Sequence, residues 1–251
     1  MKRHFLLAFC LWWCSMFSVA QVSDTDNLMR TVDESELFVN DTSIHLMKLQ
    51  VNWPEKVGNA NMEPLQKYLS MFFFGLESGD FVSALNRYVT PMGTPTDSMP
   101  ERDNAHRYYE DLQLKVVWFS KDQCLTFYAY KQVRNGEGKT LQSKRRYFTY
   151  DLVNGKVLTQ KDIFNQSRLW GVYDDDYRIL FEELLEQFAQ VGENDYIDIS
   201  KQPTDVALYK DNLLIDLGES DTRPGHDNFS LISMEYLTSF FSKDFKKWMK
   251  H

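Results

Sequence analysis

One stretch decides the fold: Tyr147-Phe-Thr-Tyr-Asp-Leu-Val-Asn-Gly-Lys-Val-Leu-Thr-Gln-Lys-Asp-Ile-Phe164. Its alternating aromatic start predicts a half-buried strand, because aromatic residues favour a pleated surface with one face covered. Asn154-Gly155 predicts a tight turn, since glycine accepts positive φ at no steric cost. Thr159 with Asp162 three residues later predicts a capped helical turn before Ile163 and Phe164 enter the core.

Two further strands are expected just before this one. Apolar residues alternate over 112–119 and 124–133, and short polar turns at 120–123 and 135–138 separate them from each other and from 141–152. Three successive strands joined by short turns predict an antiparallel meander whose third strand opens the signature stretch.

The region before the meander combines a strand with helices. Alternation over 43–53 predicts a strand that ends at Trp53-Pro54. Apolar residues at helical spacing over 65–76 predict a helix, and Phe81 begins a shorter one. A loop rich in proline and polar residues over 90–104 is the best candidate for a subdomain boundary.

The region after the signature stretch predicts a long helix over 170–191, a hairpin over 206–217, a short strand over 229–232 and a closing helix from Ser233 to Trp248. Carboxylates at 174–176 suit the start of the long helix, where they complement its dipole. The expected fold class is therefore α+β: an antiparallel meander sheet with three main helices, containing Leu65, Tyr177 and Leu237, packed on it.

The first residues predict export. A basic start, an apolar run over 5–20 and small residues at Ser18 and Ala20 are typical of a secretory signal peptide spanning 1–20. A periplasmic or extracellular location follows, with no integral membrane segment after cleavage. Only Cys124 would remain, so no internal disulfide is expected. Residues 21–42 are polar and aperiodic and are predicted to form a flexible leader.

The charge excludes one class of partner. The chain has a formal net charge of −8, and loss of Lys2 and Arg3 with the signal makes it more negative. Nucleic-acid binding requires a basic surface, so no nucleic-acid partner is expected. An acidic surface suits a basic protein partner, or serves solubility alone.

The signature stretch resembles the central motif of the RsiV-like C-terminal domain family, a domain of unknown function shared with PdaC-like peptidoglycan deacetylases. The matching residues are Thr149-Tyr-Asp-Leu152, Asn154-Gly-Lys156, Leu158-Thr159 and Asp162-Ile-Phe164. The hairpin over 206–214 and the segment Leu231-Ile-Ser-Met-Glu-Tyr-Leu237 follow in the family's order. The resemblance implies an RsiV-like C-terminal domain over 105–251, preceded by its usual companion subdomain over 43–104.

Two loops depart from the family's pattern. Members often carry a Gly-Gly-Ala-His stretch where this chain has Gly136-Glu-Gly-Lys139, and a small-residue, tyrosine-rich loop where it has residues 217–226. The resemblance implies the fold and the accessory role of the family, since deacetylase chemistry belongs to a separate catalytic domain. Both departures fall in loops, so the inference about the fold stands, while any inference about the ligand is weakened.

No catalytic residue, metal site or cofactor is expected. The histidines outside the signal are scattered without metal-ligand spacing, no nucleophile-elbow motif is present, and Cys124 lies in the middle of a strand. Two groups of residues are candidate ligand contacts: the aromatic and basic residues Tyr128, Tyr130, Arg145 and Tyr147, for stacking on sugars or meeting anions, and the loop residues Glu219, Asp221, Arg223 and His226.

The expected function is a non-enzymatic, exported cell-envelope module that binds or senses a ligand. The resemblance suggests peptidoglycan fragments or a lysozyme-like basic protein as that ligand. Two alternatives stay open: an enzyme acting on envelope glycans through an unrecognised pair of carboxylates, and a structural adaptor for another exported protein.

Overall fold

The computed structural model describes residues 27–101, 104–165, 205–219 and 227–250. The strands are β1 (Asn27–Val39), β2 (Ile44–Val57), β3 (Thr94–Pro95), β4 (Arg107–Ser120), β5 (Cys124–Asn135), β6 (Thr140–Asp151), β7 (Lys156–Val157), β8 (Asp205–Tyr209), β9 (Asn212–Glu219) and β10 (Asp227–Ser233). The α-helices are α2 (Glu63–Phe74), α3 (Phe81–Val89), α4 (Gln160–Ile163), α6 (Met234–Leu237) and α7 (Lys243–Trp248), and short 3₁₀ turns cover Thr90–Met92 and Asn104–His106. The signal peptide and the helix expected over 170–191 lie outside the described residues.

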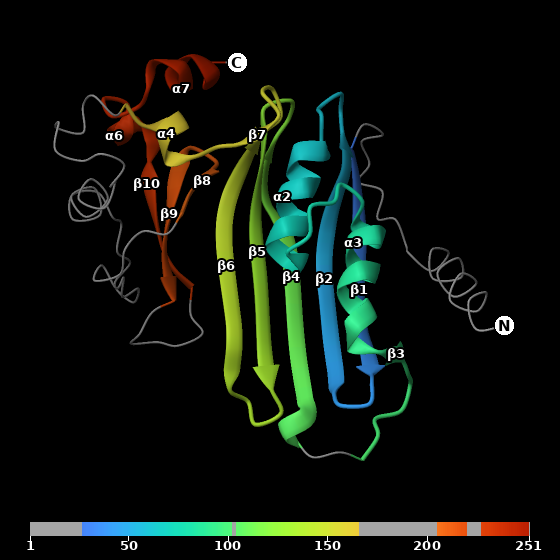
Figure 1. Ribbon diagram of the computed structural model, residues 1–251. Helices are drawn as coiled ribbons and strands as arrows, with labels where there is room; N and C mark the ends of the chain where they lie inside the picture. Colours follow the sequence, from blue (N-terminus) through green and yellow to red (C-terminus); the bar gives the residue numbers. More distant parts are fainter. Residues whose placement is uncertain (1–26, 102–103, 166–204, 220–226, 251) are drawn as a thin grey trace. The chain divides into compact units, whose positions relative to one another are not determined.

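The strands form two sheets (Figure 1). The larger has seven strands in the order β3-β1-β2-β4-β5-β6-β7, and the smaller has three in the order β10-β9-β8. The predicted α+β class is confirmed, and the meander β4-β5-β6 lies where the signature stretch predicted it. No helix in the described part of the chain is both long enough and apolar enough to cross a membrane.

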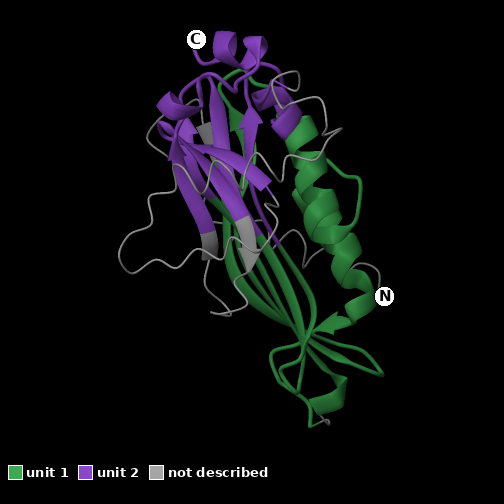
Figure 2. Cartoon of the chain, turned by 90° about the vertical axis from the view of Figure 1, so that its left-hand side faces the viewer, with its two compact units in different colours: residues 1–115, 130–144 green, residues 116–129, 145–251 purple. Residues whose placement is uncertain are grey.

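The chain divides into two compact units (Figure 2). One comprises residues 1–115 and 130–144, and the other comprises 116–129 and 145–251. Strands β4, β5 and β6 each contribute residues to both units, so the division does not follow the boundary predicted near residue 104. We call them the helix-covered unit and the small-sheet unit.

In the helix-covered unit, α2 and α3 lie on one face of the sheet (Figure 1). Proline is tolerated in the first turn of α2, where its missing N–H has no helical partner, and Gly75 ends the helix with φ of 66°. Asp80 caps α3 by accepting a hydrogen bond from the Ser83 N–H at 2.7 Å. The ring of Phe81 lies 4.9 Å from that of buried Trp53 on β2, which joins the helices to the sheet.

Most of the flexible leader predicted at 21–42 is a strand, which corrects that prediction. β1 pairs with β2 over its whole length. Val32 and Phe38 are buried on its inner face, but Glu34 and Glu36 occupy the positions between them on the same face. The two carboxylates interrupt the apolar alternation by which a strand is recognised, so periodicity alone missed it.

The inner position of Glu36 perturbs its ionisation. Glu36 lies opposite Met47, which is buried in the core. Burial, followed by the negative charge of Glu34, raises the pKa of Glu36 from 4.5 to about 7. The folded state therefore holds a proton between pH 4.5 and 7 that the unfolded state releases. The stability that depends on this proton is complete below pH 4.5 and is lost as the pH rises through 7.

We expect Glu36→Gln to stabilise the protein at pH 8 and to change little at pH 4.5, because glutamine is a permanently neutral isostere. A pKa change of this size is worth about 3 kcal/mol at full burial, and partial exposure reduces the expected gain to about 1–2 kcal/mol. Urea unfolding at both pH values measures it. Asp33→Asn, at an exposed neighbouring position on β1, is the control. An equal gain for Glu36→Gln at both pH values would contradict the assignment.

The large sheet is mostly antiparallel, as predicted, but it contains a parallel pairing that the sequence did not indicate. β2 pairs with β4 in parallel from Ile44 opposite Arg107 to Val51 opposite Leu114. After β2, the two helices and the loop that follows them return the chain to the end of the sheet where β2 begins. β4 can then run in the same direction as β2, as a parallel pairing requires.

In the small-sheet unit, buried threonines on β5 and β6 meet edge strand β8. The hydroxyls of Thr126 and Thr149 lie 2.8 Å apart. Thr126 Oγ1 donates to the Leu208 carbonyl at 2.7 Å, and the Leu208 N–H donates to Thr149 Oγ1 at 2.8 Å. The N–H and carbonyl of Leu208, which face away from β9 on this edge strand, are thereby satisfied.

The closing helix predicted from Ser233 to Trp248 is broken into α6 and α7, which is a further correction. Phe241, between them, forms a β-bridge with Phe164, and the Ser242 N–H donates to the Ile163 carbonyl at 2.8 Å. The apolar spacing was compatible with one helix, but these backbone bonds to the end of the signature stretch hold the intervening residues extended.

Candidate functional site

The signature turn is built on one buried carboxylate. Asp151 ends β6 and is only 1% exposed. Its Oδ1 accepts hydrogen bonds from the N–H groups of Val153 at 2.9 Å and Asn154 at 3.0 Å, and its Oδ2 accepts one from Asn154 Nδ2 at 2.6 Å. Gly155 closes the turn with φ of 65°. The turn is therefore a rigid platform, with both carboxylate oxygens already occupied.

The cap predicted at Thr159 and Asp162 is present. Asp162 Oδ2 accepts hydrogen bonds from the Thr159 N–H at 2.8 Å and from Thr159 Oγ1 at 2.7 Å, while Lys156 Nζ pairs with Oδ1. Partial burial raises the pKa of Asp162, but the hydrogen bonds from Lys156 and Thr159 outweigh it and hold that pKa below its usual value. Asp162 is thus kept ionised beside a lysine.

The C-terminal helix α7 closes over this cap. Ser242 Oγ donates to the Asp162 carbonyl at 2.8 Å and accepts from the Phe245 N–H at 3.0 Å. The second of these bonds is an N-cap of α7, and the first ties the helix to α4. Both roles occupy the hydroxyl, so Ser242 positions the helix.

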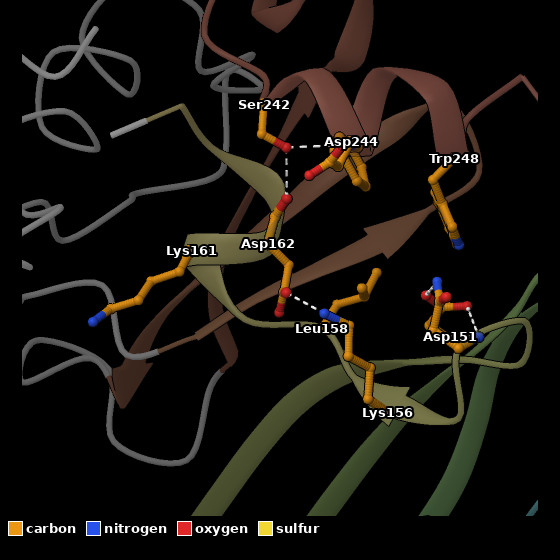
Figure 3. Close-up of a pocket in the computed structure, with 10 residues that line it drawn as sticks. Asp151, Lys156, Leu158, Lys161, Asp162, Ser242, Asp244 and Trp248 are labelled. Atoms are coloured by element: carbon orange, nitrogen blue, oxygen red, sulfur yellow. Dashed lines mark hydrogen bonds and ion pairs between the residues drawn. The ribbon is translucent and has the colours of Figure 1, made fainter. Parts of the chain in front are cut away.

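An aromatic wall completes the arrangement. The rings of Phe245 and Trp248 are stacked, with centroids 5.4 Å apart and an angle of 15° between their planes. The Trp248 carbonyl accepts from Gln123 Nε2 at 3.1 Å, which anchors the end of α7. The indole points toward Asp151 (Figure 3), and its Nε1 is buried without a hydrogen-bond partner among the described residues.

These groups enclose a pocket of about 210 Å³ (Figure 3). Pockets for drug-sized ligands have roughly 300–1,000 Å³, so this one suits a single sugar ring or one side group of a larger ligand. Its walls combine two lysines, three aspartates, an amide and a hydroxyl with an aromatic surface. The lining residues are Asp151, Asn154, Lys156, Leu158, Lys161, Asp162, Ser242, Asp244, Phe245 and Trp248.

The tyrosines and the arginine named as candidate ligand contacts are placed differently from the expectation. Tyr147 is 7% exposed, and its ring packs 4.9 Å from that of Tyr128 and 5.9 Å from that of Phe229. Tyr150 is fully buried. The expectation that Tyr147 offers an exposed ring to a ligand is therefore wrong: its ring belongs to the core, like that of Tyr150 on the same strand. Tyr130 is half-buried and belongs to the helix-covered unit.

Arg145 is turned inward. Its Nη2 lies 2.5 Å from Oδ1 of the buried Asp216, and neighbouring Arg146 pairs with Asp205 at 2.7 Å. Burial raises the pKa of Asp205 to about 6, although the charge of Arg146 opposes this. The guanidinium predicted to meet an anionic ligand thus has a carboxylate partner within the fold.

The predicted loop cluster lies at the edge of the described structure. Glu219 is the last residue of β9, while Asp221, Arg223 and His226 lie outside the described residues. Their ligand role stays a prediction. Among the described residues, no group of three or more histidine, cysteine or acidic side chains is arranged to hold a metal ion.

The pocket residues were missed as a site. Asp151, Lys156 and Asp162 are part of the signature, but the pattern around them indicated a turn and a cap. Ser242 and Trp248 come more than 75 residues later in the chain, and only the spacing of their helix was informative. The signal in the sequence that could have indicated a site was the presence of these three charged side chains within twelve residues of the signature stretch.

Comparison with known proteins supports the fold. No family model and no curated protein matches the chain. A solved structure of a DUF3298 family member from Bacteroides fragilis is similar over 94% of this chain and 100% of its own, with a TM-score of 0.59 and 14% identity. A DUF3298 family protein from Pseudomonas aeruginosa PAO1 is similar over 86% and 95%, with a TM-score of 0.53 and 11% identity. DUF3298 is the RsiV-like C-terminal domain, and at these identities the likeness shows that this chain has the fold of those proteins.

Proposed function

We propose that this chain is an exported cell-envelope binding module and that the pocket beside the signature turn binds a sugar-containing fragment of peptidoglycan. The observation that carries the proposal is Trp248, which lines a polar pocket and whose buried Nε1 has no acceptor among the described residues. Sugars are bound by an aromatic surface together with hydrogen-bonding groups, and the pocket supplies both.

The pocket is suited to binding rather than to catalysis. The oxygens of Asp151 and Asp162 are occupied by turn and cap hydrogen bonds, and the lowered pKa of Asp162 is the opposite of what a general acid needs. The Ser242 hydroxyl is engaged with backbone groups. We therefore propose a non-enzymatic role for this site.

The affinity for a ligand in this pocket should depend on both the aromatic ring and the N–H group of Trp248. We expect Trp248→Ala to weaken binding of purified muropeptides about tenfold or more, because it removes the aromatic wall. Trp248→Phe keeps a ring but loses the N–H donor. It should weaken binding about 2- to 10-fold, the worth of one net hydrogen bond. Isothermal titration calorimetry with muropeptides measures both variants, and circular dichroism confirms that each is folded.

The matched control is Tyr236→Ala on α6, an exposed aromatic residue that does not line the pocket. It should bind like the wild type. Unchanged affinity in both Trp248 variants, or no heat of binding for the wild type, would overturn the proposal.

A basic protein is the second candidate ligand, because the chain carries a net charge of −8. Such a complex would weaken steeply with added salt and would not depend on Trp248. Lysozyme titrated at low and high salt distinguishes this outcome from muropeptide binding.

A further inference from the structure

A second polar cluster lies in the helix-covered unit, separate from the pocket. Ser43 follows β1, His45 is the second residue of β2, and Glu110 lies on β4, which pairs with β2 in parallel. Ser43 Oγ is 3.0 Å from His45 Nε2, and His45 Nδ1 is 3.6 Å from Glu110 Oε1. A hydroxyl, an imidazole and a carboxylate thus follow one another in the order used by nucleophilic serine sites.

The neighbouring hydrogen bonds favour donation of the Ser43 hydroxyl proton to His45, and this direction activates the serine. Asn40 Oδ1 already accepts the N–H groups of Thr42 at 2.8 Å and Ser43 at 2.7 Å, which fill the two lone pairs of a carbonyl oxygen. The Ser43 hydroxyl proton also lies within reach of Asn40 Oδ1, at 3.0 Å, but His45 Nε2 is the acceptor with a lone pair to spare. A proton on Nδ1 then faces the Glu110 carboxylate.

Glu110 is held in place from its other oxygen. It is 5% exposed, and Tyr88 on α3 donates to its Oε2 at 2.6 Å. Burial raises the pKa of Tyr88, so the phenol stays a neutral donor. The His45 ring is stacked on Tyr108, with centroids 4.9 Å apart and an angle of 17° between the planes. The orienting carboxylate and the plane of the imidazole are both fixed before any substrate arrives.

We propose that Ser43 is an activated nucleophile that reacts with carboxylic esters, with His45 as its general base and Glu110 as the positioning carboxylate. The inference goes beyond the binding role proposed above, since it concerns the other unit and different residues. The contact from Nδ1 to Glu110 is longer than a hydrogen bond, and such contacts often shorten when substrate binds.

The reaction balances with water as co-substrate. His45 Nε2 takes the Ser43 proton while Oγ forms a bond to the acyl carbon, and the ester C–O bond breaks as the leaving alkoxide takes that proton. Water then adds to the acyl carbon and gives a proton to His45. The Oγ–C bond breaks, Oγ regains the proton, and an acid and an alcohol have been formed from the ester.

The local backbone sets the class of ester. The N–H groups of Thr42 and Ser43 are engaged with Asn40 Oδ1, so they do not form a ready oxyanion site. General-base assistance alone accelerates the reaction about 10²–10⁴-fold. The expected substrates are therefore activated esters with good leaving groups, because their carbonyl carbon is electrophilic enough to be attacked without strong stabilisation of the oxyanion.

The test is covalent labelling of the full chain with a fluorophosphonate probe, followed by mass spectrometric mapping of the adduct. We expect one adduct, on Ser43. Ser43→Ala should abolish it, and His45→Gln should slow labelling about 100-fold or more, as loss of a general base predicts. Tyr88→Phe, which leaves Ser43 and His45 intact but removes the hydrogen bond that holds Glu110, should slow it less. Ser35→Ala, at an exposed serine on β1, is the control and should label like the wild type.

Two results would overturn the inference: no adduct on wild-type protein under conditions that label chymotrypsin completely, or an adduct on Ser43 that forms equally fast in His45→Gln. Both are read from protein that is shown to be folded. Muropeptide binding at the Trp248 pocket is measured independently, so failure of one proposal leaves the other intact.

Discussion

Arg145→Met should lower the free energy of unfolding by about 3–5 kcal/mol, the largest effect expected of any substitution considered for this chain. Arg145 is 8% exposed and Asp216 is 1% exposed, so their ion pair is almost completely removed from water. Removing the guanidinium leaves an ionised carboxylate beside the second carboxylate of Asp205, which faces Asp216 across β8 and β9. Without the guanidinium, the two buried carboxylates repel each other, and the cost of removing Asp216 from water is no longer compensated.

Chemical denaturation of wild type, Arg145→Met, Asp216→Asn and the double variant measures the coupling between the two side chains. The double variant should recover part of the loss, because no unpaired charge then remains at position 216. Lys67→Met is the matched control: it breaks the exposed pair with Glu63 and should leave stability unchanged. A loss for Arg145→Met no larger than that of the control would show that the pair is solvated.

The features predicted well from sequence are those set by neighbouring residues. The strand, turn and cap of the signature stretch depend on Tyr150, Gly155 and Thr159, each of which acts within a few positions along the chain. β1 was missed because Glu34 and Glu36 occupy inner positions, which local hydrophobicity assigns to the surface. The parallel pairing of β2 with β4 joins segments about 60 residues apart, and no local period records such a partner.

The candidate site was predictable only in part for the same reason. Asp151 and Asp162 were visible as structural residues of the signature, but Trp248 reaches the turn through bonds from Ser242 to Asp162 and Ile163. Those bonds also break the closing helix, so the same contacts explain why the helix was overpredicted and why the pocket was missed. Arg145 and Tyr147 were chosen for their chemistry, but side-chain chemistry does not reveal which face of β6 is covered.

Lys131→Met should destabilise the protein by about 2–4 kcal/mol, because it leaves the buried Phe73 carbonyl and the Tyr88 hydroxyl without the hydrogen-bond donor that both now have. Lys131 is 5% exposed, and its Nζ donates to the Phe73 carbonyl at 2.6 Å and to Tyr88 Oη at 2.7 Å. Phe73 lies in the last turn of α2, where carbonyls lack helical partners and a positive charge complements the dipole. The same substitution deprives the buried Glu110 of its nearby positive charge.

The pH dependence separates this role from simple loss of packing. Burial lowers the pKa of Lys131 from 10.5 to about 8, although the charge of Glu110 opposes it. Between these values the unfolded state binds a proton that the folded state releases, so this group adds stability as the pH rises from 8 to 10.5. Wild type should show that gain in urea unfolding, Lys131→Met should lack it, and Lys115→Met at an exposed position should retain it. If Lys131→Met kept the wild-type slope between pH 8 and 10.5, the slope would come from other groups, and the ammonium of Lys131 would not be buried in the folded state.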